Sequence, residues 1–335
     1  MLRPLALCLL LTFAPITSAV AQSSVQPSCS GRDMLAEMHA QAPEVHARLA
    51  GAAAQVINTE AMLWRVEKAG VAPSHLMGTV HVTDERVTRW SPRVTAALAG
   101  AKSMALEVAD LSPAAMAAAI GKSVPLLFYT DGRQLRSVLS PEQFAKASAS
   151  IAKAGLPAEA AGQIKPWFVF MLHAVSECEA GRQAAGKPPL DALLQNEGLR
   201  RGIPVIGLET LEGQIAQMAA IPEAQQVAML KATLHFADRT ADQMETILQL
   251  YLKRQLGYTL PFQYELARQA GVEPSAFQSF ERDLIDKRNV GMVAASRPLL
   301  DKGGAFIAVG AMHLVGKSGL VEQLRQAGYI VSAVE

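Results

Sequence analysis

Two segments far apart in the sequence carry the same short turn. Gly-Thr-Val-His occupies residues 78–81 after a β-prone run, and Gly-Ala-Met-His occupies residues 310–313 after an apolar run. Each turn is followed by a predicted helix and a second β-prone run, over residues 91–108 and 318–334. This order predicts a right-handed βαβ unit with parallel strands at each end. The repeat therefore favours an α/β fold.

We expect a central mixed, largely parallel sheet built from these two units, with a helical region of about residues 111–300 between them. A short strand near residues 204–208 interrupts the helical region. One of its helices has a clear start, because Ser140 and Gln143 form a capping box. No low-complexity linker divides the chain. We therefore expect residues 22–335 to form a single domain.

Residues 1–21 are typical of a secretory signal peptide. Arg3 precedes an apolar run, and Ala-Val-Ala at residues 19–21 fits the rule for cleavage after Ala21. Without this segment the chain has 30 basic and 30 acidic residues, a balance that argues against nucleic-acid binding. No later apolar run is long enough to span a bilayer. We expect a periplasmic or secreted protein without stable membrane insertion.

Cleavage would also remove one of the three cysteines and leave Cys29 and Cys178. An even pair in an oxidising compartment favours a disulfide, and two unpaired buried thiols are the alternative. Pairing further requires that the two Cα atoms lie within about 7 Å of each other, which the sequence does not give.

Four predicted strands each bring an ionisable side chain to one edge of the sheet. His81 and His313 lie in the two turns, and Glu107 and Glu209 end apolar runs. The carboxyl ends of parallel strands share an edge, so these side chains should lie close together. Two imidazoles with one or two carboxylates suit a divalent metal ion such as Zn, Mn or Co. As alternatives, the histidines could cap loops and the glutamates could pair with arginine.

The rest of the sequence contains no further catalytic or metal-binding motif that we recognise. The sequence has no H-E-x-x-H, G-x-S-x-G or paired CxxC motif. The remaining histidines share no ligand spacing, and we assign them core or surface roles: His39, His46, His75, His173 and His235.

Together these motifs resemble the TraB/GumN family, most closely its exported bacterial GumN-like branch. That family includes the TIKI membrane-tethered metalloproteases. The resemblance runs from about residue 28 to residue 335. It is carried by both Gly-x-x-His turns and by Leu63-Trp64-Arg65, Leu106-Glu107, Gly207-Leu208-Glu209-Thr210 with Glu212 and Gln214, and Lys287-Arg288-Asn289.

The resemblance implies a set of metal ligands, which are His81, His313 and Glu107. It also implies catalytic positions, which are Glu107, Glu209, Arg288 and Asn289. In the mechanism that we expect, Glu107 or Glu209 is the third ligand and the other is the general base. Arg288 would stabilise the developing oxyanion, although an ion pair at the sheet edge is an equal alternative.

The expected function is metal-dependent hydrolysis, with a peptide as substrate because the TIKI relatives cleave peptides. The alternative is a non-catalytic periplasmic protein that binds or sequesters a peptide or small ligand. Metal content together with turnover separates the two hypotheses. A third, an accessory role in exopolysaccharide production, rests only on the context in which the name GumN arose.

Overall fold

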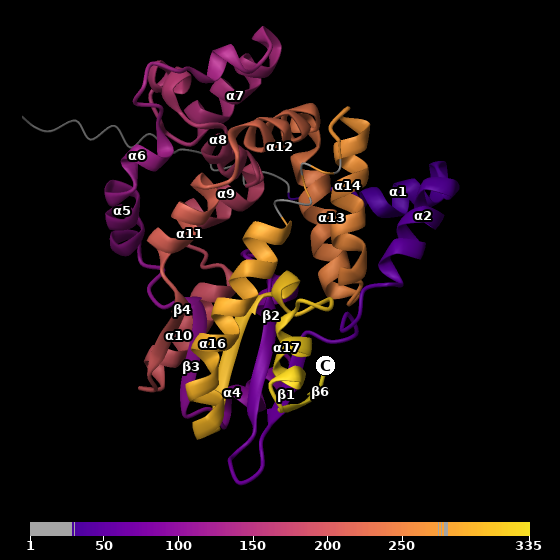
Figure 1. Cartoon of the computed structure of the whole chain (residues 1–335), viewed down its shortest axis with the longest axis vertical. Coiled ribbons are helices and arrows are strands. Elements are labelled where there is room, and N and C mark those ends of the chain that lie inside the picture. The colour runs from indigo at the N-terminus through magenta and orange to yellow at the C-terminus, as the bar shows by residue number, and fades with distance from the viewer. Residues whose placement is uncertain (1–28, 30, 274, 276, 278–280) are drawn as a thin grey trace, which may run out of the picture.

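Six strands form one twisted sheet in the lower half of Figure 1. The computed structural model describes residue 29 and residues 31–335, except 274, 276 and 278–280, so the expected signal peptide lies outside the described residues. The strands are β1 (Leu63–Glu67), β2 (Ser74–Thr79), β3 (Ser103–Val108), β4 (Val205–Glu209), β5 (Ala305–Gly310) and β6 (Ile330–Ala333).

The strand order is β4-β3-β5-β2-β1-β6. Each neighbouring pair among β4, β3, β5 and β2 is parallel, whereas β1 is antiparallel to both β2 and β6. The predicted α/β fold with a mixed, largely parallel sheet is therefore confirmed. The two strand–turn–helix–strand units are interleaved, because β5 of the second unit lies between β2 and β3 of the first.

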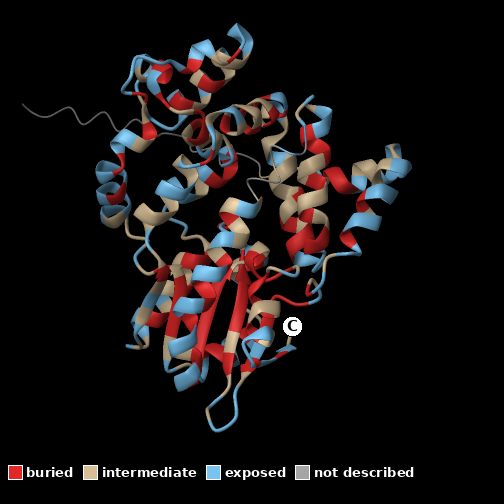
Figure 2. Cartoon of the chain, in the orientation of Figure 1, coloured by how far each residue is buried: buried red, intermediate tan, exposed pale blue. Residues whose placement is uncertain are grey.

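Helices cover both faces of the sheet. On one face, α4 (Pro92–Ala99) and α10 (Leu190–Arg200) pack through Leu98 and Leu194 against Met104 and Phe306 of the strands. On the other face lie α16 (Lys287–Lys302) and α17 (Leu320–Gln326), which belong to a larger apolar core. Figure 2 shows the strands buried between these layers. Four helices thus fix the strands whose carboxyl ends carry the predicted site.

Most other helices lie above the carboxyl ends of β2, β3, β4 and β5 (Figure 1). Ser140 and Gln143 form the predicted capping box at the start of α7. In the described part of the chain, no helix is long and apolar enough to cross a membrane. The helices above the strand ends are α5 (Pro113–Lys122), α6 (Val124–Leu127), α7 (Pro141–Lys153), α8 (Pro166–His173), α9 (Glu177–Ala184), α11 (Leu211–Ala219), α12 (Glu223–His235), α13 (Thr240–Leu252) and α14 (Thr259–Gln269).

A disulfide joins the N-terminal segment to this helical region. Cys29 and Cys178, at the start of α9, are bonded with a Cα–Cα distance of 5.3 Å, so the predicted pairing is confirmed. Further along the same segment, the Met34 N–H donates to Thr246 Oγ1 of α13 at 2.8 Å. The disulfide thus ties the N-terminal segment to α9, and the hydrogen bond ties it to α13.

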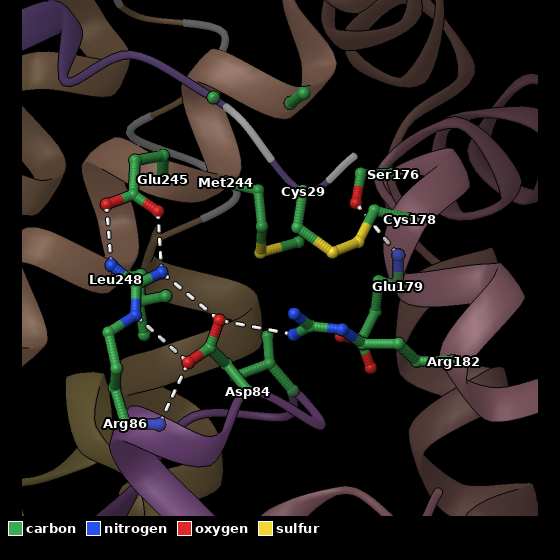
Figure 3. Close-up of a pocket in the computed structure, with 13 residues that line it drawn as sticks. Cys29, Asp84, Arg86, Ser176, Cys178, Glu179, Arg182, Met244, Glu245 and Leu248 are labelled. Carbon is green, nitrogen blue, oxygen red and sulfur yellow. Dashed lines mark hydrogen bonds and ion pairs between the residues drawn. A yellow bond between two sulfur atoms is a disulfide. The ribbon is translucent and has the colours of Figure 1, made fainter. Parts of the chain in front are cut away.

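The loop after β2 lies between α9 and α13 and is fixed by a charge network (Figure 3). Asp84 accepts hydrogen bonds from Arg86 Nε at 3.0 Å and from Arg182 Nη1 of α9 at 3.2 Å. Arg86 also donates two hydrogen bonds to Glu245 of α13, at 2.7 and 2.9 Å. Because this loop includes His81, the network helps to position one of the predicted site residues.

This network gives a pH-dependent prediction. Burial opposes ionisation of Asp84, but hydrogen bonds from Arg86 and Arg182 outweigh it and lower the pKa of Asp84 to about 2. An unfolded aspartate has a pKa of about 3.9, so this contribution is present above about pH 4 and is lost as the pH falls toward 2. We expect the free energy of unfolding to fall more steeply between pH 4 and pH 2 in the wild type than in Asp84→Asn. Denaturant titrations across this range measure it, and equal slopes would contradict the prediction.

Candidate functional site

Four adjacent parallel strands place the predicted side chains at one edge of the sheet. His81 follows β2, Glu107 lies near the end of β3, and Glu209 is the last residue of β4. His313 ends η6 (Ala311–His313), the single turn that follows β5. The sheet therefore brings all four residues together, as the parallel-strand argument predicts. With Arg288 of α16 they form what we call the rim site.

The first glycine of each Gly-x-x-His turn allows a close approach. A Cβ on Gly78 would lie 2.9 Å from Leu314 Cδ1 and 3.0 Å from Ala311 Cβ. Since real Cβ atoms do not approach so closely, glycine is what lets η6 pack against the end of β2. The two turns are therefore in direct contact.

Gly310 has a different role, because it leaves space among three side chains of the rim site. Its N–H donates to Glu107 Oε1 at 2.6 Å. A Cβ at this position would lie 3.1 Å from Glu107 Oε1, 3.5 Å from His81 Nε2 and 3.6 Å from His313 Cδ2. Glu107 and both histidines thus surround one small space that glycine keeps open.

Both histidines are held through Nδ1. His81 Nδ1 lies 2.7 Å from Asp191 Oδ2, and the other oxygen of Asp191 accepts from Thr79 Oγ1 at 2.7 Å. His313 Nδ1 lies 2.7 Å from Asn289 Oδ1. Because these partners are oxygen acceptors, Nδ1 carries the proton and Nε2 keeps its lone pair in the neutral ring. An oxygen partner at one ring nitrogen is the usual support of a metal-binding histidine.

Arg288 joins the two glutamates of the rim site. Its Nη2 donates to Glu107 Oε2 at 2.6 Å and to Glu209 Oε2 at 2.7 Å, and its Nε donates to Glu209 at 3.0 Å. Gln214 of α11 adds one hydrogen bond of 3.1 Å to each carboxylate. The three charged side chains are 11–13% exposed. A buried cation therefore fixes β3, β4 and α16 to one another.

Arg288 has little capacity left for a substrate. Its hydrogen bonds to the two glutamates use Nε and both N–H groups of Nη2. One N–H group of Nη1 donates to the Leu284 carbonyl at 3.2 Å. One of five guanidinium N–H groups remains. The geometry thus favours the ion-pair role over the oxyanion role for this arginine.

The environments of the rim site separate the charges of its residues. Burial lowers the pKa of His313 to about 4, so this ring is neutral at pH 7. Burial opposes ionisation of Glu107, but positive charge on His313, His81 and Arg288 lowers its pKa to about 2. At the low pH where Glu107 titrates, both histidine rings are positively charged. Desolvation works against a charge on His81, yet the Asp191 carboxylate outweighs it and raises the pKa of His81 to about 9. His81 is therefore positively charged at pH 7, and a metal ion that binds its Nε2 must displace a proton.

A family model described as TraB/PrgY/gumN matches residues 62–333, a range that contains the whole sheet and the rim site. The chain belongs to the TraB/PrgY/gumN family. Neither the curated proteins nor the solved structures give a significant match. The matched range begins after α1 (Met34–Gln41) and α2 (Pro43–Ala53), which precede the sheet.

In this TraB/PrgY/gumN protein the rim site has the kinds of side chain that bind a metal ion. These side chains, however, lie too far apart to hold one ion together. Glu107 is ionised, and the hydrogen bonds that hold the two histidines use Nδ1 and not Nε2. His313 Nε2 lies 3.8 Å from Glu107 Oε1. Among the described residues, no three His, Cys, Asp or Glu side chains are already spaced to hold one ion. Binding a metal here therefore requires His81, His313 and Glu107 to move closer together.

The structure adds residues that the sequence motifs do not single out. Asp191 lies 110 residues from His81 in sequence, in the first turn of α10. The only sequence signal for it is an acidic residue at a helix start, which is a common feature. Gln214 belongs to a stretch that resembles the family, and it contacts both glutamates. Glu212 of the same stretch points away and pairs with Lys122.

The Arg288 cluster predicts a large loss of stability when the cation is removed. Arg288→Met leaves two buried carboxylates without their partner, and breaking a buried ion pair costs about 3–5 kcal/mol. We expect a decrease of that size in the free energy of unfolding, measured by denaturant titration. Glu209→Gln should be less destabilising in the Arg288→Met background than alone. Arg282→Met is the matched control, because Arg282 is 59% exposed and should change stability by less than about 1 kcal/mol.

Gly310 gives a second prediction. In Gly310→Ala the new Cβ pushes the Glu107 carboxylate away, so we expect the free energy of unfolding to decrease by about 1–3 kcal/mol. Gly291, exposed on α16 with no atom within 4 Å of a built Cβ, is the control. Gly291→Ala should leave stability unchanged or increase it by up to about 1 kcal/mol. If Gly310→Ala were as stable as the wild type, the close contact would be wrong.

Proposed function

We propose that this TraB/PrgY/gumN protein is a metal-dependent hydrolase that cleaves peptides at the rim site. The observation that carries the proposal is the pair of Gly-x-x-His turns, whose histidines are each held through Nδ1 and share one space with an ionised Glu107. His81, His313 and Glu107 would hold the ion. A divalent metal such as Zn, Mn or Co supplies Lewis acidity and lowers the pKa of bound water.

The chain's own residues account for the proton transfers. Glu209 Oε1 receives only the longer contact from Arg288, at 3.2 Å, and keeps the capacity to accept a proton. As the water oxygen bonds to the peptide carbonyl carbon, Glu209 takes the water proton. It then delivers that proton to the leaving amine as the C–N bond breaks. Arg288 holds Glu107 and Glu209 in place, and Asn289 and Asp191 orient the histidines.

A groove beside the rim site supports an extended substrate. It has a volume of about 1080 Å³, and His81 and Glu107 are among the residues that line it. Met116 of α5 and Leu199 of α10 present large exposed apolar surfaces along it. An extended peptide with uncharged side chains matches this lining better than a strongly charged ligand. The Cys29–Cys178 disulfide supports a periplasmic or secreted location.

One observation favours the second candidate function, which is ligand binding or sequestration without turnover. Both glutamates are paired with Arg288 and hydrogen-bonded to Gln214, and in the described residues no three ligand side chains are spaced for one ion. A protein that only binds a peptide or small ligand in the groove would need neither a free base nor a metal.

The deciding experiment compares metal content and peptidase activity in the wild type, His81→Ala and His313→Ala. We expect one metal ion per chain at the rim site, measured by elemental analysis after incubation with Zn, Mn or Co as the difference in metal content between the wild type and the two variants. Both variants should lose the ion and cleave a peptide library at least about 100-fold more slowly, because metal and activated water are lost together. Asn289→Ala should weaken metal affinity about 10–100-fold while keeping the ligands.

His235→Ala serves as the matched control, because His235 is exposed near the end of α12 and far in sequence from the rim site. Full metal loading in both His81→Ala and His313→Ala would overturn the ligand assignment. Tight ligand binding with no metal and no product in the wild type would favour the binding protein.

A further inference from the structure

Two histidines outside the rim site lie in contact at the N-terminal helical hairpin. His39 belongs to α1 and His46 to α2, and the two helices are joined at Ala42. Their Nδ1 atoms are 3.3 Å apart, and their ring centroids are 4.5 Å apart at an interplanar angle of 70°. Their spacing of seven residues in sequence does not predict a ligand pair, because a turn rather than one continuous helix brings the rings together.

The distance between the two nitrogens matches the geometry of a shared metal ion. A Zn–N bond is about 2.0–2.1 Å in tetrahedral sites, which places two ligand nitrogens about 3.3–3.4 Å apart. Two neutral imidazoles can also share a proton at this distance, with one Nδ1 donating to the other. Replacing that proton by a metal ion requires only that two partly exposed side chains rotate slightly.

The hairpin that carries the rings is well fixed. Leu35 of α1 and Leu49 of α2 are buried together with Leu250 of α13. The ring of His46 stacks on Tyr258 of η4 (Leu256–Tyr258), with centroids 6.0 Å apart and an angle of 28°. The backbone therefore loses little conformational entropy when the two side chains bind an ion.

We propose that His39 and His46 form a second metal site, in which two Nδ1 atoms bind a borderline divalent ion such as Cu(II) or Zn(II). Among the described residues no third His, Cys, Asp or Glu completes the set, so water supplies the remaining ligands. Imidazole nitrogen suits these ions, and Cu(II) should bind more tightly than Zn(II). The bound ion would link α1 to α2 and stabilise the hairpin.

The experiment separates this site from the rim site. Cu(II) is titrated into untagged protein carrying His81→Ala and His313→Ala, with folding checked by circular dichroism, and binding is followed by calorimetry and electron paramagnetic resonance. We expect one Cu(II) per chain with two nitrogen ligands. Adding His39→Ala or His46→Ala should weaken binding at least tenfold, whereas adding His235→Ala should not change it.

A second measurement uses the otherwise wild-type chain. Zn(II) should raise the Tm by a few degrees, because an ion that binds only the folded state stabilises it. The increase should shrink in His39→Ala and persist in His235→Ala. Equal Cu(II) binding with and without His39 and His46, or no binding in the starting variant, would overturn the proposal. Neither result bears on metal binding at His81 and His313.

Discussion

The buried ion pairs of Arg288 are the interaction on which the rim site depends. Glu107 and Glu209 come from neighbouring parallel strands, so their negative charges lie side by side in a poorly solvated place. A single guanidinium from α16 neutralises both and hydrogen-bonds to both. Without it, at least one carboxylate would take up a proton or turn away. The position of α16 against the sheet is thus tied to the charge state of the site.

The strand order explains how the two Gly-x-x-His turns become one site. In an ordinary βαβ unit the two parallel strands are neighbours, and turns from two separate units would lie apart. Here β5 is inserted between β2 and β3, in register with both. His81, Glu107 and His313 therefore come from three adjacent strands. Glycine at positions 78 and 310 makes this arrangement possible, one by close packing and the other by leaving space.

Local signals in the sequence predict much of this fold. β3 lies where the apolar run places it, and Ser91 and Gly100 flank α4 as N-cap and C-cap. The convergence of the four ionisable residues also follows from strand direction alone. The interleaved strand order does not, because it depends on packing between segments more than 200 residues apart. Asp191 is not predictable for the same reason, since its contact with His81 is purely tertiary.

The inserted position of β5 also has a consequence for when the site can form. The strand pair β2–β5 joins residues separated by about 230 positions, and β3 gains its inner neighbour only when β5 arrives. A nascent chain that lacks β5 has a gap in the middle of its sheet and has not yet reached His313. Long-range pairing of this kind also makes folding slow. The rim site is therefore assembled late, only after nearly the whole chain has been synthesised.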